Sequence, residues 1–338
     1  MIIDVYNHFM PKPFLDRLAD LIPGHVVLKA FPRLRTLWDV EARLKLLDRF
    51  GDYAQILSLA NPPIELLAGP EQTPELARIA NDGLAELCRA HPDRFPAFIA
   101  SMPMNNVAAC LQEIERAVGT LGARGIQVFT NVAGTPLSAP QFRPIFARMA
   151  QLDLPIWIHP IRGPQFADYT SESQSEAEIW FTFGWPYETT AAVTRLIYSG
   201  IYDELPGLKI ITHHMGGIVP MLEGRIGPGN DQLGARTSDE DLSLVLKRLK
   251  KRPLDYFKHS FYADTATFSA EPAMHTGLAF FDHDKVVFAS DCPFDPEKGT
   301  MYTRDTLRIL EGIDMPKADK DKIWYGNLER ITGTKLVK

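Results

Sequence analysis

Short apolar runs alternate with longer amphipathic stretches along almost the whole chain. The runs are rich in β-branched residues, and turn residues such as Pro206-Gly207 separate the two kinds of segment. Strands that alternate with helices pair in parallel, because each crossover returns the chain to the same end of the sheet. We therefore expect strands at 2–6, 53–59, 96–102, 125–130, 155–159, 208–213, 260–264 and 285–290.

Helices are expected between these strands, because apolar residues recur there at spacings of three and four. The clearest of them cover 40–50, 74–90, 107–121, 141–152 and 188–199. Eight strand–helix units favour an α/β fold of the closed (β/α)8 TIM-barrel type over an open sheet. Such barrels often reach 338 residues as one domain, so we expect a single domain over 1–338.

Charge and cysteine content exclude several classes of partner. A formal net charge of −6 disfavours nucleic acid and anionic membranes, which would repel the chain. No apolar stretch is long enough to span a bilayer, and the first residues do not resemble a signal peptide. The 3 cysteines form no CxxC pair, which fits a reducing compartment. We expect a cytoplasmic enzyme with a small-molecule substrate.

Two long segments interrupt the alternation, at 9–37 and 161–186. The second contains four aromatic residues, Trp180, Phe181, Phe183 and Trp185. Long loops at the strand ends of a barrel usually shape the substrate pocket. We expect these aromatic side chains to line a pocket or a subunit interface, with plain packing against the barrel as the alternative.

Histidine and aspartate residues follow four of the expected strands. His8 follows the first strand, His159 ends the fifth, His213 and His214 end the sixth, and Asp291 ends the eighth. The carboxyl ends of barrel strands converge on one face, where active sites form. Imidazole and carboxylate groups together suit one divalent metal ion, with Zn²⁺ the first choice and Mn²⁺ possible.

Several short motifs follow one another along the chain: Trp38-Asp39, Gly125-Ile126-Gln127-Val128, Ile158-His159-Pro160, Leu205-Pro206-Gly207-Leu208-Lys209-Ile210, His214-Met215-Gly216-Gly217 and Ala289-Ser290-Asp291. Their order and spacing resemble the amidohydrolase-2 group of the amidohydrolase superfamily, which includes decarboxylases of aminocarboxymuconate semialdehyde and γ-resorcylate. The resemblance runs from Asp4 to Trp324–Leu328.

The resemblance implies a role for each strand-end residue. His8, His159 and Asp291 match metal ligands, and His214 matches an acid/base beside a metal-bound water. Asp291 is a second candidate for accepting the proton of that water. His213 is expected to turn away from the centre, because neighbouring residues of a strand face opposite sides.

The resemblance also implies substrate-binding residues. Arg225 matches an arginine that binds a substrate carboxylate, and Arg43 is a second candidate, since a guanidinium donates two parallel hydrogen bonds to a carboxylate. An ion pair at the surface or between subunits is the alternative for both. Phe294, close behind Asp291, is expected to line the pocket or to pack beside it.

Tyr6 departs from the family pattern, which has a histidine or a glutamate at this place. A protonated phenol is a poor ligand. Tyr6 therefore ligates as a phenolate, or hydrogen-bonds a metal-bound water, or marks a site that binds metal weakly or not at all. We favour a position beside the metal, in contact with substrate.

The resemblance favours a metal-dependent, non-oxidative decarboxylase that acts on a small aromatic or unsaturated carboxylic acid. The same residues would also serve a hydrolase or hydratase of a lactone, amide or unsaturated dicarboxylate, because these reactions use the same strand-end groups. A catalytically silent binding protein is the third alternative, suggested by Tyr6. By resemblance, a homodimer or homotetramer is expected.

Overall fold

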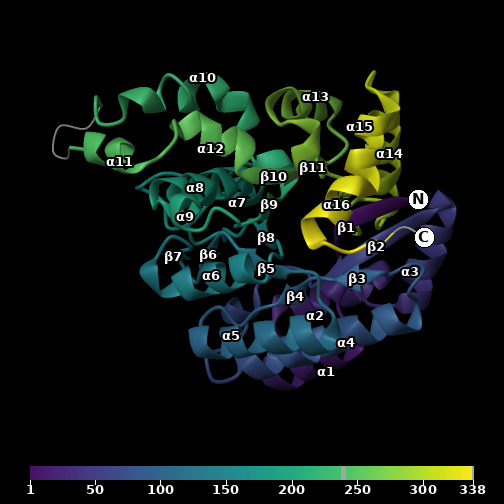
Figure 1. Ribbon diagram of the computed structural model, residues 1–338. Coiled ribbons are helices and arrows are strands. Elements are labelled where there is room, and N and C mark those ends of the chain that lie inside the picture. Colours follow the sequence, from purple (N-terminus) through teal and green to yellow (C-terminus); the bar gives the residue numbers. More distant parts are fainter. Residues whose placement is uncertain (237–240, 337–338) are drawn as a thin grey trace.

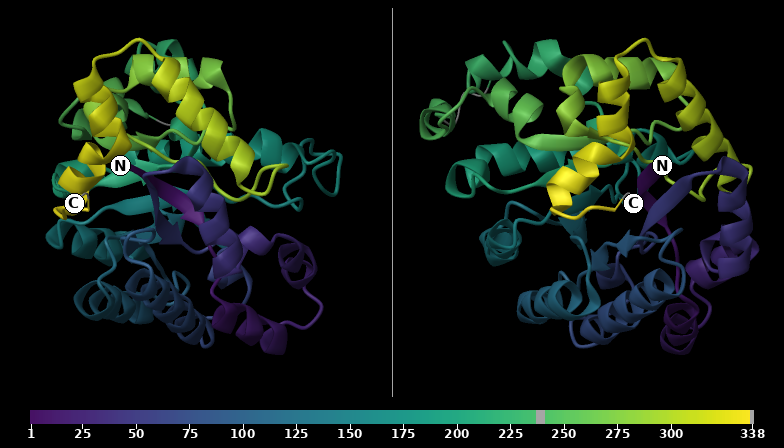
Figure 2. Two further views of the ribbon diagram at one scale, coloured as in Figure 1. Left: turned by 90° about the vertical axis from the view of Figure 1, so that its right-hand side faces the viewer. Right: turned by 45° about the vertical axis from the view of Figure 1, so that its right-hand side comes forward.

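The strands of the computed structural model, which describes residues 1–236 and 241–336, form a parallel barrel with helices around it (Figures 1 and 2). The third strand is split into two short pieces on either side of Ile99. In chain order the barrel strands are β1 (Ile2–His8), β2 (Tyr53–Ser58), β3 (Ala97–Phe98) with β4 (Ala100–Ser101), β5 (Ile126–Phe129), β8 (Ile156–His159), β9 (Ile210–Thr212), β10 (Phe261–Asp264) and β11 (Val286–Val287).

The strands pair in the order in which they occur in the chain. One run is β1-β2-β3, and the other is β4-β5-β8-β9-β10-β11, with parallel pairing throughout both. Backbone hydrogen bonds join the first strand to the last: Val5 N donates to Phe288 O at 2.8 Å and His8 N to Cys292 O at 2.7 Å. In both figures β1 lies beside the C-terminal helices. The barrel is therefore closed, and each of the eight expected strands is confirmed.

Helices cover the outside of the barrel. Those that follow barrel strands or their loops are α3 (Val40–Leu47), α4 (Thr73–Ala90), α5 (Val107–Arg116), α6 (Arg143–Gln151), α8 (Gly184–Tyr198), α12 (Pro253–His259), α13 (Glu271–Phe280) and α14 (Thr300–Gly312). The shorter ones are α1 (Lys12–Leu21), α2 (Val26–Ala30), α7 (Ile179–Thr182), α9 (Ile201–Glu204), α10 (Glu223–Ile226), α11 (Ser243–Arg248), α15 (Lys317–Asp321) and α16 (Asn327–Thr332). The five expected helices are all found, and the one expected at 107–121 ends as a turn of π-helix, Ala117–Leu121.

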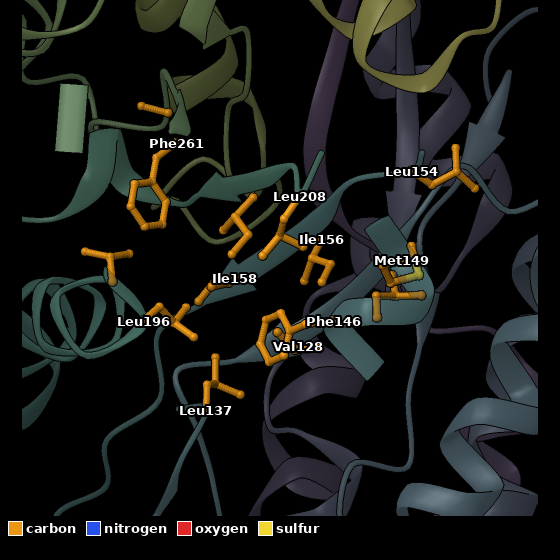
Figure 3. Close-up of a cluster of buried hydrophobic side chains, with 14 of the residues drawn as sticks. Val128, Leu137, Phe146, Met149, Leu154, Ile156, Ile158, Leu196, Leu208 and Phe261 are labelled. Carbon is orange, nitrogen blue, oxygen red and sulfur yellow. The ribbon is translucent and has the colours of Figure 1, made fainter. Parts of the chain in front are cut away.

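Alternate residues of β8 pack on opposite sides of the barrel wall. Ile156 and Ile158 of β8 face outward, where they meet Phe146 of α6 and Leu196 of α8 in a buried cluster (Figure 3). Trp157, between them in sequence, belongs to the cluster that fills the barrel. This period of two is what β-pleating requires.

Gly125, just before β5, makes room for the buried ring of Trp157. A Cβ atom there would lie 2.4 Å from Pro155 O and 2.5 Å from Cζ3 of the tryptophan, and the backbone has φ +154°. Only glycine satisfies both constraints.

The two segments that interrupt the alternation lie at the carboxyl ends of β1 and β8. The first folds as α1 and α2, and Arg17 of α1 forms an ion pair with Glu75 of α4 at 2.9 Å. The second runs without regular structure to α7 and leads into α8. None of the helices described is both long and apolar enough to cross a membrane.

Candidate active site

The strand ends bring the expected histidine and aspartate side chains together around one carboxylate. Nε2 of His8 lies 3.1 Å from Oδ1 of Asp291. Nε2 of His213 lies 3.5 Å from the same oxygen, and Nε2 of His214 lies 3.5 Å from Oδ2. The ring of His159 is 5.3 Å from the rings of both His8 and His213. Asp291 therefore has three imidazole groups as direct neighbours.

The expectation that His213 turns away from the centre is wrong. Its ring stacks on that of His214 with centroids 3.7 Å apart, so both side chains point the same way. Strand alternation does not apply here, because β9 ends at Thr212 and His214 has φ 55°. Asp291 also has a left-handed φ, of 61°. Such conformations cost free energy and gather at functional sites.

Asp264, at the end of β10, holds both histidines of this pair. Its Oδ2 lies 2.5 Å from Nδ1 of His213, and its Oδ1 accepts a hydrogen bond from the backbone N of His214 at 3.0 Å. Asp264 and His213 are both fully buried. A carboxylate on Nδ1 fixes the ring and leaves Nε2 as the free nitrogen.

The two other histidines are oriented through the same nitrogen. Nδ1 of His8 lies 3.3 Å from Leu59 O and 3.1 Å from Ser58 Oγ. Nδ1 of His159 lies 2.6 Å from Pro160 O. Each ring is therefore held at Nδ1, and Nε2 is the nitrogen left for a ligand.

Burial and mutual charge separate the pKa values of these groups. Burial alone would raise the pKa of Asp291, but the neighbouring imidazoles of His213, His214 and His8 hold it well below its usual range. Burial would lower the pKa of His213, but the charge and hydrogen bond of Asp264 raise it to about 9. For His159 and His214, burial and the charge of neighbouring histidines lower the pKa.

The donor atoms of the cluster fit a divalent metal ion. One atom from each of His8, His159 and His213 lies within 4.8 Å of the others, and so does one from each of His213, His214 and Asp291. Among the described residues, Nε2 of His8 and Nε2 of His213 are buried without a hydrogen-bond partner. Unpartnered buried nitrogens are costly unless something binds them. Imidazoles beside a carboxylate are a donor set that Zn²⁺ or Mn²⁺ accepts.

Tyr6 lies beside the histidines, with its hydroxyl directed elsewhere. The hydroxyl donates to Oε1 of Gln127 at 2.9 Å, while the ring packs against that of His213 with centroids 4.4 Å apart. Burial, together with the charges of Asp264 and Asp291, raises the pKa of the phenol well above its ordinary value. The hydrogen bond to Gln127 uses the proton of the hydroxyl, which does not favour the phenolate ligand.

Two adjoining cavities, of about 140 and 260 Å³, open onto the cluster. Both are bounded by aromatic side chains of the segment after β8 and by Phe268. The first is lined by Phe181, Thr182, Trp185, Pro186, His214, Phe268 and Tyr302, and the second by Phe31, Asn61, His159, Phe181, Trp185, Phe268, Asp291 and Phe294. Phe181 and Trp185 thus line a pocket, while Phe183 is 70% exposed.

The structure does not bring the two predicted arginines to this pocket. Arg43 is fully buried, and its guanidinium donates to Thr36 O, Gln55 Oε1 and His8 O. These bonds occupy it within the protein, and it borders neither cavity. Arg225 lies exposed on α10 and lines neither cavity. Phe294 does line the larger cavity, with its ring 5.7 Å from that of His8.

Sequence reasoning did not mark Asp264 and Gln127, which lie against the histidine cluster and Tyr6, or Asn61, which borders the larger cavity. Asp264 is the last residue of the seventh strand, so its place at a strand end could have marked it. Gln127 lies in the middle of β5, where the pattern shows only that it is buried. Phe268 and Tyr302 carried no sequence signal of a pocket.

Several known proteins with similar sequences and structures are decarboxylases. γ-Resorcylate decarboxylase of Rhodococcus jostii (strain RHA1) is 32% identical over 334 residues, 96% of this chain and 96% of that protein. 2-Amino-3-carboxymuconate-6-semialdehyde decarboxylase of Dictyostelium discoideum is 30% identical over 265 residues, 76% of this chain and 67% of that protein. The structure of 5-carboxyvanillate decarboxylase from Novosphingobium aromaticivorans, with bound manganese, matches with a TM-score of 0.83 and 28% identity, covering 98% of this chain and 97% of that one.

The family assignment rests on nearly the whole chain. The family model described as amidohydrolase matches residues 3–332, which include every barrel strand except the first residue of β1. Its span contains the strand-end cluster and the aromatic segment after β8. The chain therefore belongs to the amidohydrolase family, and its homologues are metal-dependent decarboxylases of aromatic and related carboxylic acids.

Proposed function

We propose that this protein is a metal-dependent, non-oxidative decarboxylase of a small aromatic carboxylic acid. One observation carries the proposal: a cavity walled by aromatic side chains ends on His159 and Asp291, and the adjoining cavity ends on His214. An aromatic ring fits between such walls by edge-to-face packing. The names of the relatives point to the same substrate class.

His8, His159 and Asp291 would hold the metal ion. A divalent ion supplies positive charge that binds and orients the substrate carboxylate. Zn²⁺ suits three protein ligands with an open position, and manganese is the ion in the 5-carboxyvanillate decarboxylase structure. Elemental analysis of protein purified without chelator tests this: about one Zn or Mn per chain, lost in His159→Ala, is expected.

The chain's own acid/base groups are His214 and Asp291. Decarboxylation needs a proton on the ring carbon that bears the carboxylate; the bond to the carboxylate then breaks, CO₂ leaves, and the bonding electrons restore the aromatic ring. Nε2 of His214 is 3.5 Å from Oδ2 of Asp291 and borders the smaller cavity. The pair can therefore pass a proton between solvent and a bound ring.

The residues that line the two cavities favour a substrate with a single carboxylate. Of the described residues, no arginine or lysine is among those that border either cavity. A second carboxylate would be buried there without a cationic partner, which is costly. Asn61 borders the larger cavity, and its buried Oδ1 has no hydrogen-bond partner. This oxygen would accept a hydrogen bond from a ring hydroxyl.

A deuterium experiment tests the reaction. Hydroxybenzoates with one carboxylate, and aromatic and muconate-type dicarboxylates, would be incubated with the metal-loaded protein in D₂O. The proposal expects CO₂ from a monocarboxylate and one deuterium at the carbon that lost it, seen by NMR. Hydrolysis of a lactone or amide, with no CO₂ from any acid, would instead establish the hydrolase.

We also propose that the protein forms a homodimer or homotetramer. Phe183 is 70% exposed, Tyr187 56% and Met221 80%, and large apolar side chains of this kind often pack between subunits. Light scattering after gel filtration tests the assembly, and a monomer would exclude it.

A further inference from the structure

The geometry points to His213 as a further protein ligand of the metal ion, placed by Asp264 so that its Nε2 meets His8, His159 and Asp291. This inference rests on the proposed function, because it concerns the same metal ion. It reverses the role expected for His213, and it makes the donor set three imidazoles and one carboxylate.

His213 belongs to both groups of donor atoms in the cluster. It lies within 4.8 Å of donors from His8 and His159, and within the same limit of donors from His214 and Asp291. His8, His159 and Asp291, taken without His213, do not form such a group among the described residues. An ion held between His8, His159 and Asp291 would therefore also lie next to His213.

The free nitrogen of His213 is directed into the cluster. Its Nδ1 is held by Asp264 at 2.5 Å, and its Nε2 is fully buried, has no hydrogen-bond partner and lies 3.5 Å from Asp291 Oδ1. A carboxylate behind a histidine is the usual support of a metal-bound imidazole, because it fixes the tautomer and makes Nε2 more basic.

Tyr6 occupies the space beside His213 and offers no ligand of its own. Its hydroxyl donates a hydrogen bond to Oε1 of Gln127 at 2.9 Å, and its ring packs against the imidazole of His213. His213 thus supplies a nitrogen donor on the side of the cluster where Tyr6 supplies none.

His214 is a matched control for His213. The two residues are adjacent, stack on each other and both approach Asp291 at 3.5 Å. Only His213 belongs to the group with His8 and His159, whereas His214 borders the aromatic cavity. The structure therefore assigns metal binding to His213 and proton transfer to His214.

Mn²⁺ affinity separates these roles without any substrate. Free Mn²⁺ would be titrated by EPR in the wild type, His213→Asn and His214→Asn. Asparagine can still donate to Asp264 but has no atom at the place of Nε2. We expect Mn²⁺ binding at least about 100-fold weaker in His213→Asn and changed less than about 3-fold in His214→Asn. Equal affinity in His213→Asn and wild type would overturn the inference.

The same titration distinguishes the two proposals. A wild type that binds no Mn²⁺ or Zn²⁺ would remove the metal site and with it the proposed function. A wild type that binds one ion, with His213→Asn equally tight, would leave the proposed function intact and overturn only the role of His213. Thermal unfolding of the metal-free proteins shows whether each variant is folded.

A measurement on the wild type covers the case in which His213→Asn does not fold. In protein loaded with Co²⁺, each imidazole bound through Nε2 gives one shifted, exchangeable Nδ1–H proton signal. Three such signals are expected, from His8, His159 and His213, and two would overturn the inference.

Asp264→Asn should weaken Mn²⁺ binding about 10- to 100-fold, because the ring of His213 would no longer be held by a carboxylate.

Discussion

At the scale of single residues, the chemistry of the site depends on which nitrogen of each histidine is free. His8, His159 and His213 are held at Nδ1 by a backbone carbonyl or by Asp264. His214 differs, because neither ring nitrogen has a hydrogen-bond partner. A histidine with no fixed partner is suited to gain and lose a proton, and the fixed ones are suited to hold a metal ion.

Replacing His214 therefore tests proton transfer. We expect His214→Asn to lower kcat for decarboxylation about 10²- to 10⁴-fold, the usual contribution of general acid/base catalysis, with metal content unchanged. Stopped-flow or continuous assay of CO₂ release, beside elemental analysis, measures both. Full activity in this variant would mean that Asp291 transfers the proton unaided.

Arg43 stabilises the fold, and its replacement separates this role from substrate binding. In Arg43→Met, the carbonyls of His8 and Thr36 lose a buried donor, and each such loss costs about 1–3 kcal/mol. We expect the free energy of unfolding in denaturant to fall by at least about 2 kcal/mol, with KM little changed in the folded fraction.

Arg225→Met is the control for Arg43→Met, since Arg225 is exposed on α10. Its free energy of unfolding should stay within about 0.5 kcal/mol of the wild type. A rise in KM for Arg43→Met with unchanged stability would restore the carboxylate-binding role that the sequence suggested.

At this scale the sequence predicted the identity of the site residues better than their orientation. His8, His159, His214 and Asp291 could be placed because each stands at the end of an apolar strand. The direction of His213 could not be predicted, because it depends on where β9 stops and on the left-handed φ of His214. The burial of Arg43 depends on acceptors from β1, β2 and the segment before α3, which no local pattern reveals.

At the scale of elements, the segment from β8 to α8 builds the wall of the pocket. Phe181 of α7 borders both cavities, and the Nε1 of Trp185 in α8 donates to Arg162 O at 3.1 Å, which ties the helix to the segment. Four aromatic residues were expected to line a pocket or an interface. Two of them, Phe181 and Trp185, line the pocket because α7 and the start of α8 turn them toward the strand ends.

Phe181 and Phe183 form a matched pair in this element. Phe181→Ala removes a ring that packs against bound substrate, so KM should rise about 10-fold or more, which corresponds to roughly 1.4 kcal/mol. Phe183 borders neither cavity and is 70% exposed, so Phe183→Ala should leave KM within about 2-fold. Steady-state kinetics measures both, and equal effects would show that the pocket wall lies elsewhere.

The strands could be predicted from the sequence because short β-branched runs between turn residues have few other interpretations. Helix ends and loop conformations could be predicted less well from the sequence. The π-helical turn at 117–121 and the short α7 carry no distinct periodicity, since each is set by packing against neighbouring elements.

At the scale of the whole molecule, one buried acid makes stability depend on pH. Glu65 is 7% exposed, and burial raises its pKa to about 8 from 4.5. Between these two pH values the folded state keeps a proton that the unfolded chain has lost. The free energy of unfolding therefore falls as pH rises through this window, by about 1.4 kcal/mol per pH unit for one group, and levels off above it.

Glu65→Gln should remove this pH dependence. The variant is expected to be more stable than the wild type at pH values near 8 and about equally stable near 4.5. Thermal unfolding across the range measures the difference, with Glu71→Gln, an exposed neighbour, as the control. Parallel stability curves for wild type and Glu65→Gln would show that Glu65 ionises normally in the folded protein.

Closure of the barrel between β1 and the segment after β11 has a consequence for synthesis. His8 and Asp291 come from the two ends of the barrel sequence, and their approach depends on the backbone bonds between those ends. In a growing chain His8 is made long before Asp291, so the two side chains can meet only after the last strand of the barrel has been made. The complete site therefore forms late, and contacts so distant in sequence make folding slow. Until then the first strand has an open edge, which could pair with another chain.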